Sequence, residues 1–144
     1  MFVAAVACAP LQYTLRTVKV GLVAPLSGPA HVDGQQWVLK ARDAVWRWNT
    51  TVLAGRPYRI ELVIYDAVEG TAVARRLSVD PEVIGAVMAS PQAAPEDMAI
   101  LVPDLASLDQ AMGQLLDAVT QSLGQPAAVR REAVRAILGK PAAR

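Results

Sequence analysis

The sequence predicts a three-layer α-β-α domain built on a three- or four-stranded parallel sheet with strand order 2-1-3. Three apolar runs, residues 18–23, 59–65 and 83–88, alternate with two helical patterns, which is typical of parallel strands joined by right-handed crossovers. The first run is apolar on both faces, as expected for a strand covered by helices on both sides. A length of 144 residues favours one domain.

The stretch 17–34 contains the first strand, a tight loop and the start of a helix. Pro25 has no N–H group for a ladder hydrogen bond, so the strand should end there. Ser27, Gly28 and Gly34 are then expected in a flexible loop at the carboxyl end of the strand. In an open α/β sheet, ligands bind at that edge.

The first helix is expected over residues 35–49. Apolar residues at helical spacing form one stripe, on which Trp37 and Trp48 are predicted to lie in the core, whereas Trp46 projects away from it. A separate charged face is expected to form pairs at i+3 and i+4 spacing; it consists of Lys40, Asp43 and Arg47.

After the second strand, a short helix is predicted over residues 71–78 and a third strand over 83–88. Residues 98–102 form an apolar run that fits either a fourth strand or the front of a helix, because periodicity does not decide for so short a segment.

Two helices are expected to complete the domain, over residues 105–123 and 127–138. The first has an apolar stripe of leucines and other large side chains. In the second, the simplest interpretation of Arg130, Arg131 and Arg135 is a solvated face.

The composition argues against several classes of function. A formal net charge of +1 gives no electrostatic reason to expect nucleic-acid binding. The single cysteine, Cys8, excludes an internal disulfide and a cysteine-based metal site, and the single histidine, His31, excludes a histidine-rich one.

Motifs for cofactors and catalysis point the same way. The loop APLSGPAHVDG does not match a dinucleotide fingerprint, and no Gly-Lys-Ser/Thr phosphate loop is present. Asp33, Asp66 and Glu69 could approach one another at the sheet edge, where loop solvation and helix capping are favoured over a metal or acid–base role. We therefore expect no enzyme activity, no cofactor and no metal.

Several segments together resemble a known family. These are VKVGLVAPLSGP, the pair Gln35-Gln36, Ala44-Val45 with Asn49, GRPYRIELVIYD and ARRLSVDPEVIGAV, which follow one another within residues 18–87. They resemble the start of the type I periplasmic solute-binding proteins of ABC transporters, of the branched-chain amino-acid or leucine-binding kind. LDQAMGQLLDAV followed by REAVRAIL is similar to the late helix pair of that family.

The resemblance implies that residues 17–140 form a single solute-binding-like lobe. Family members have two lobes with the ligand between them, and the matching segments belong to one. In the family, the loops after the first and third strands hold the ligand, which here points to Ser27, Gly28 and Ser90. The loop sequences differ from those of the family, since Ala30 occupies a position where the family often has an aromatic residue. For both serines, the alternative is a structural role. In that role, Ser27 would be a turn residue whose hydroxyl bonds its own backbone.

The resemblance also gives a meaning to residues 1–16. MFVAAVAC ends in small residues before Cys8, like the end of a lipoprotein signal, although the basic n-region is missing. We expect a signal remnant and tether with Cys8 as the lipidated residue, and an extracytoplasmic, membrane-anchored protein in the periplasm or at the cell surface. The alternative is a frayed N-terminus with a cysteine by chance.

The resulting functional prediction is a reduced, non-catalytic solute-binding domain with weak or lost binding of a small polar solute such as an amino acid. A single lobe buries little of a ligand, and good sites bury about 70–90% of it. Expected partners are a transporter permease or a second copy of the chain, with a lipid anchor in the membrane and no nucleic acid. The alternatives are a structural or protein-interaction lipoprotein that kept the lobe without the ligand site, and a truncated gene product.

Overall fold

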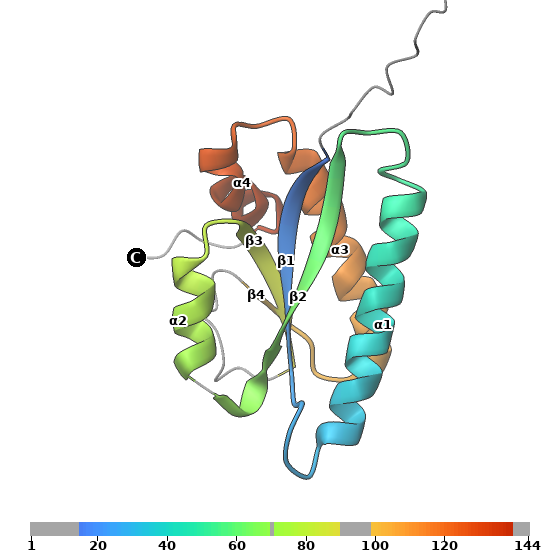
Figure 1. Ribbon diagram of the computed structural model, residues 1–144, viewed down its shortest axis with the longest axis vertical. Coiled ribbons are helices and arrows are strands. Elements are labelled where there is room, and N and C mark those ends of the chain that lie inside the picture. Colours follow the sequence, from blue (N-terminus) through green and yellow to red (C-terminus); the bar gives the residue numbers. More distant parts are fainter. Residues whose placement is uncertain (1–14, 70, 90–98, 140–144) are drawn as a thin grey trace, which may run out of the picture.

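A four-stranded parallel sheet organises the computed structural model, which describes residues 15–69, 71–89 and 99–139 (Figure 1). The strands lie in the order β2-β1-β3-β4, and each neighbouring pair is parallel. Their bounds are β1 Arg16–Ala24, β2 Tyr58–Asp66, β3 Val83–Met88 and β4 Ala99–Leu101. The predicted fold class and the order 2-1-3 are confirmed, and the ambiguous run 98–102 provides the fourth strand.

Helices cover both faces of the sheet. α1 (His31–Thr50), α3 (Leu108–Ser122) and α4 (Arg130–Ile137) pack on one face, and α2 (Thr71–Val79) packs on the other (Figure 1). Short 3₁₀ turns, Ala67–Glu69, Leu105–Ser107 and Ala127–Val129, precede α2, α3 and α4.

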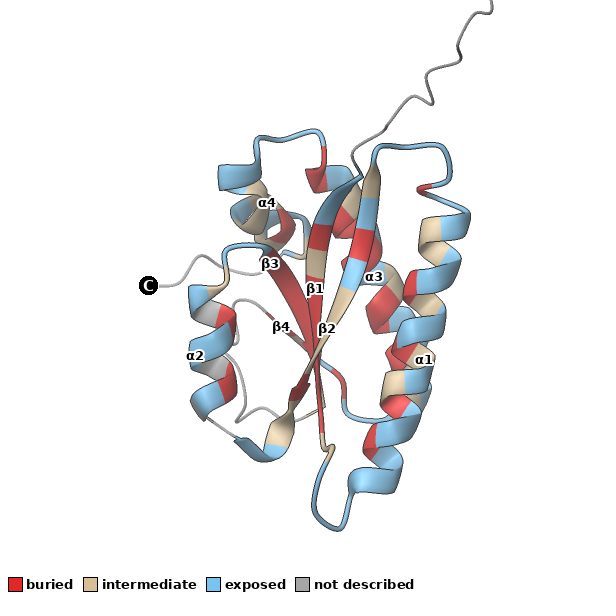
Figure 2. Ribbon diagram, in the orientation of Figure 1, coloured by how far each residue is buried: buried red, intermediate tan, exposed pale blue. Residues whose placement is uncertain are grey.

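The central strand β1 explains the three layers. Its residues Val18, Val20 and Leu22 are buried against α1 and α3, whereas Val23 is buried on the α2 side. Figure 2 shows most of β1 and β3 in red, the colour of buried residues. β3 is buried along its whole length. Two apolar faces on adjacent strands require helices on both sides, since burying apolar area is the main stabilising contribution to folding.

α1 begins four residues earlier than residue 35, at His31, and Gly34 lies within its first turn. The reason is a close approach: a side chain at Gly34 would overlap the carbonyl oxygen of Pro25. The expectation that Gly34 belongs to a flexible loop is therefore wrong. Glycine is required here because the helix packs directly on the end of β1.

The tryptophan predictions for α1 are supported. Trp37 is buried, and Trp48 is half-buried with its Nε1–H donating to Thr120 Oγ1 at 2.8 Å. Trp46 is 64% exposed. On the charged face, Arg47 pairs with Asp43 at 3.0 Å, but Lys40 reaches across to α3.

Asn49, near the end of α1, fixes this helix to the edge strand. Its Nδ2 donates to the carbonyl of Ile60 at 2.8 Å, and its Oδ1 accepts from the Ile60 N–H at 2.9 Å. One side chain thus satisfies both backbone groups of a residue in β2, in the manner of a neighbouring strand.

The C-terminal helices follow the prediction except at two arginines. Leu108, Met112, Leu115 and Leu116 are fully buried against the sheet. Arg130 and Arg131, however, are not simply solvated, and both are half-buried. Arg130 Nε donates to the Gln125 carbonyl at 3.2 Å. The Arg131 guanidinium donates to backbone carbonyls of Leu77, Asp80 and Val83. α4 packs on the turn before β3, where carbonyl groups need donors.

Candidate functional site

The carboxyl edge of the sheet brings together the loops that follow β1 and β2. Ser27 follows β1, and its hydroxyl donates to Asp66 Oδ2, at the end of β2, at 2.7 Å. Asp66 Oδ1 accepts from the backbone N–H groups of Leu26 and Val68, both at 3.1 Å. Because β1 and β2 are parallel neighbours, their carboxyl ends lie side by side, and one carboxylate ties both loops together.

These contacts also set the charge at this edge. The hydroxyl of Ser27, followed by the backbone N–H groups, holds the pKa of Asp66 below its ordinary value of 3.8. Asp66 is therefore a carboxylate near neutral pH, with its oxygens already accepting hydrogen bonds from within the chain.

Gly28 forms the turn that leads into α1. It has a φ of 78°, in the left-handed region that side chains disfavour, while a Cβ there would meet open space. Its carbonyl accepts from the His31 N–H at 3.2 Å and lies 2.9 Å from His31 Nδ1. The positive φ thus favours glycine at this position, and the exposed turn is hydrogen-bonded to the first residue of α1.

The end of β3 lies next to the loop after β1. The Ala89 N–H donates to the Val23 carbonyl at 2.9 Å, so the ends of β1 and β3 lie side by side. Ser90 and Cys8 lie outside the described residues. Of the predicted site residues, the structure therefore describes Ser27 and Gly28, and a ligand-binding role for either stays a prediction.

The acidic residues near this edge have separate partners. Glu69 accepts from Arg76 at 2.7 Å, and Asp66 binds Ser27 as described above. Over residues 15–69, 71–89 and 99–139, no three histidine, cysteine or acidic side chains are grouped as a metal site requires. Asp66 links the loops that follow β1 and β2 in this structure.

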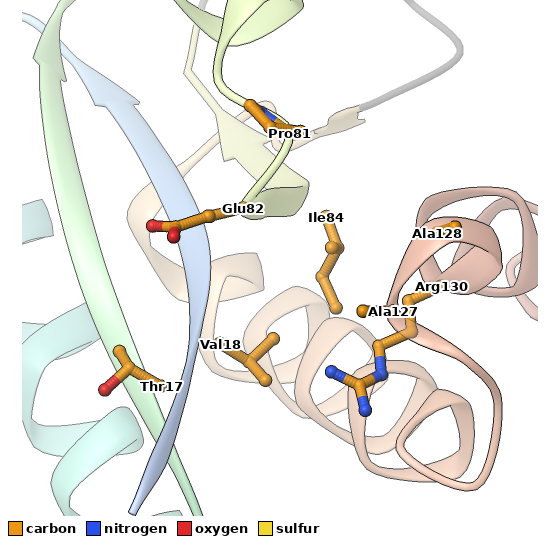
Figure 3. A pocket seen from close by; sticks show the side chains of 8 residues that line it. All are labelled: Thr17, Val18, Pro81, Glu82, Ile84, Ala127, Ala128 and Arg130. Carbon is orange, nitrogen blue, oxygen red and sulfur yellow. The ribbon is translucent and has the colours of Figure 1, made fainter.

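A pocket that the sequence did not suggest lies at the opposite, amino edge of the sheet (Figure 3). It has a volume of about 350 Å³ and opens between the starts of β1 and β3 and the turn before α4. We call it the amino-edge pocket. Its lining residues are Thr17, Val18, Pro81, Glu82, Ile84, Ala127, Ala128 and Arg130.

Together these features define an α/β architecture with two candidate sites at opposite ends of its strands. In the described ranges, every helix is too short or too polar to cross a bilayer.

No family model matches the chain, and no curated protein matches it. Among solved structures, a possible leucine/isoleucine/valine-binding protein from Rhodopirellula baltica SH 1 is similar, with a TM-score of 0.45 and 19% sequence identity. The match covers 72% of this chain but 26% of that protein, so the chain spans about a quarter of that protein's length.

Proposed function

We propose that the chain is a non-catalytic, solute-binding-like domain whose carboxyl edge has weak or lost affinity for a small polar solute such as a branched-chain amino acid. The supporting observation is the position of the edge in the topology. From β1 the chain crosses to β2 on one side, and β3 lies on the other. The carboxyl ends of β1 and β3 are therefore neighbours at a topological switch point, where open α/β sheets bind ligands.

The contacts at this edge argue for weak binding. The Ser27 hydroxyl already donates its proton to Asp66, so a ligand would have to replace that bond or use the remaining lone pair. The carboxylates of Asp66 and of Asp33, in the first turn of α1, disfavour the carboxylate of an amino acid. One face of exposed loops leaves much of a ligand in water, where each hydrogen bond contributes about 1 kcal/mol or less.

Thermal melting with leucine, isoleucine and valine tests this proposal. A ligand present at about ten times its dissociation constant adds about 1.4 kcal/mol of stability. We expect about 10 mM leucine to move the melting temperature by little or nothing. A shift above about 5 °C at about 0.1 mM leucine would contradict weak binding. Light scattering would then show whether a second copy of the chain covers the other side of the bound ligand.

A matched pair of variants locates any effect. Ser27→Ala removes the hydroxyl that donates to Asp66, and Ser107→Ala removes a similar exposed hydroxyl that donates to Asp104 at 2.8 Å before α3. Any weak response to leucine should be altered by the first variant alone. An equal change in both would place the binding elsewhere.

We propose further that the protein is extracytoplasmic and anchored through a lipid on Cys8. The support is the sequence resemblance and the small residues before Cys8. Two acyl chains, at about 0.8 kcal/mol per buried methylene, would hold the protein at a membrane. Metabolic labelling with a fatty-acid probe should mark the native protein and not Cys8→Ser. Unlabelled native protein in the cytosolic fraction, with no leader encoded upstream of Met1, would overturn this.

The alternative function, a protein-interaction domain, is favoured by one surface of α1. Val32, Leu39 and Trp46 are 56%, 67% and 64% exposed and lie seven residues apart, so they form one apolar ridge. The equal spacing suits a second copy of the chain, because an antiparallel two-fold axis at Leu39 would place each Val32 against the partner's Trp46.

Sedimentation distinguishes this alternative. A single helix pair covers less than the roughly 800 Å² per partner of a stable interface, so we expect weak, concentration-dependent dimers. Leu39→Glu should abolish them, and Val79→Glu, at a 72% exposed position on α2, should not. A monomer at all concentrations would exclude this surface as a dimer interface.

A further inference from the structure

We propose that the amino-edge pocket binds a small carboxylic acid with a short aliphatic body, and that Arg130 holds its carboxylate. This pocket lies at the other end of the strands from the carboxyl edge. The inference therefore does not rest on the proposed function, and either can fail alone.

The inner wall of the pocket is apolar. Val18 at the start of β1 and Ile84 in β3 form its floor, with exposed fractions of 3% and 5%. Pro81 and the turn residues Ala127 and Ala128 line its sides (Figure 3). A volume of about 350 Å³ is at the small end of the range for ligand pockets, about 300–1,000 Å³, so it suits a small molecule with a few carbon atoms.

Arg130 is the charged side chain that points into this space. Figure 3 shows its guanidinium extending from the start of α4 toward Val18. The group is held in place: Nε donates to the Gln125 carbonyl at 3.2 Å, and the guanidinium carbon lies 5.4 Å from the centre of the Tyr58 ring. Nη2 lies 3.5 Å from the Tyr58 hydroxyl, and among described residues Nη1 has no partner. Nη1 is thus available to a carboxylate, the anion that a guanidinium binds well.

The acidic residue of the pocket does not neutralise Arg130. The Glu82 carboxylate points away from the guanidinium and pairs with Lys19 Nζ at 2.8 Å (Figure 3). That hydrogen bond is the main reason that the pKa of Lys19 is raised, with a further contribution from the nearby Asp80. With Glu82 and Asp80 both directed to Lys19, the pocket offers a cation for a carboxylate but no free carboxylate for an ammonium group. A simple carboxylic acid therefore fits better than an amino acid.

An NMR titration of the full chain tests the assignment with three probes of the same aliphatic body: 3-methylbutanoate, leucine and 3-methylbutanol. We expect 3-methylbutanoate to shift the methyl signals of Val18 and Ile84, with leucine and the alcohol binding at least about tenfold more weakly. Equal binding of the alcohol or of leucine, or no shift with about 20 mM 3-methylbutanoate, would overturn the proposal.

Variants then test the role of the guanidinium. Arg130→Gln should weaken 3-methylbutanoate binding by about tenfold or more. Arg42→Gln makes the same charge change on exposed α1 and should leave the affinity unchanged. An unchanged affinity in Arg130→Gln would contradict the proposal. The comparison of the three probes on the unmodified protein decides the question even if that variant does not fold.

Discussion

The contact between Gly85 and Leu115 gives the sharpest test of how α3 packs on the sheet. Gly85 lies in the middle of β3, and a Cβ added there would lie 2.7 Å from Leu115 Cδ1 and 3.4 Å from Val134 Cγ1. Leu115 is fully buried. The missing side chain in the strand therefore provides the space that the leucine fills.

The two single substitutions should both destabilise the protein. Gly85→Ala overpacks this contact, at about 1–3 kcal/mol, and regains about 0.4–1 kcal/mol by restricting the unfolded chain, which leaves a net cost of up to about 2.6 kcal/mol. Leu115→Ala removes a fully buried side chain and should cost about 2–5 kcal/mol. For a chain of this size, each kcal/mol lowers the melting temperature by about 3–4 °C.

The double variant gives the decisive result. In the Leu115→Ala background, the new methyl group of Gly85→Ala enters the space that the leucine has left, so Gly85→Ala should become neutral or stabilising there. Urea unfolding followed by tryptophan fluorescence measures all four free energies of unfolding. Effects that add within about 0.3–0.5 kcal/mol would refute the contact, since independent sites behave in that way.

Two further predictions concern links between elements. Asn49→Ala should lower the free energy of unfolding by about 1–3 kcal/mol, measured by urea unfolding, because both backbone groups of Ile60 lose their partner; a loss below about 0.5 kcal/mol would contradict that link. Since the pKa of Asp66 is lowered by the Ser27 hydroxyl, the stabilisation from this carboxylate is present above the unfolded-state pKa and is lost as pH falls through the lowered folded-state value. Ser27→Ala should therefore destabilise the protein more at neutral pH than near pH 2, and equal destabilisation at both would show that the hydroxyl does not act through the Asp66 charge.

The fold followed from local sequence patterns because those patterns are caused by burial. The apolar faces of 18–23 and the fully apolar run 83–88 identify strands inside a parallel sheet, and these became β1 and β3. The start of α1 was misplaced for a physical reason. Gly34 looks like a loop residue in sequence, but it serves a close approach of helix and strand that depends on tertiary packing.

The polar links between distant segments were harder to predict. Ser27 and Asp66 are 39 residues apart, and only the parallel pairing of β1 and β2 brings them together. That pairing was predicted, so the link could have been inferred from the two strand ends. The contacts of Arg131 could not be inferred in this way, because its partners are backbone carbonyls. Every residue has such a carbonyl, so the sequence does not indicate which ones accept a hydrogen bond.

The two edges of the sheet differ in how far their polar groups are already satisfied, and this difference determines what each can bind. At the carboxyl edge, the Ser27 hydroxyl and the Asp66 oxygens are used within the chain, so a ligand must displace existing hydrogen bonds. At the amino edge, Asp80 and Glu82 form ion pairs with Lys19 and not with Arg130. The guanidinium of Arg130 therefore faces the apolar wall of the amino-edge pocket. Because a charged nitrogen that has no partner among the described residues, here Nη1, favours an anion with an aliphatic body when it lies beside apolar surface, the amino edge has the stronger chemical case for binding.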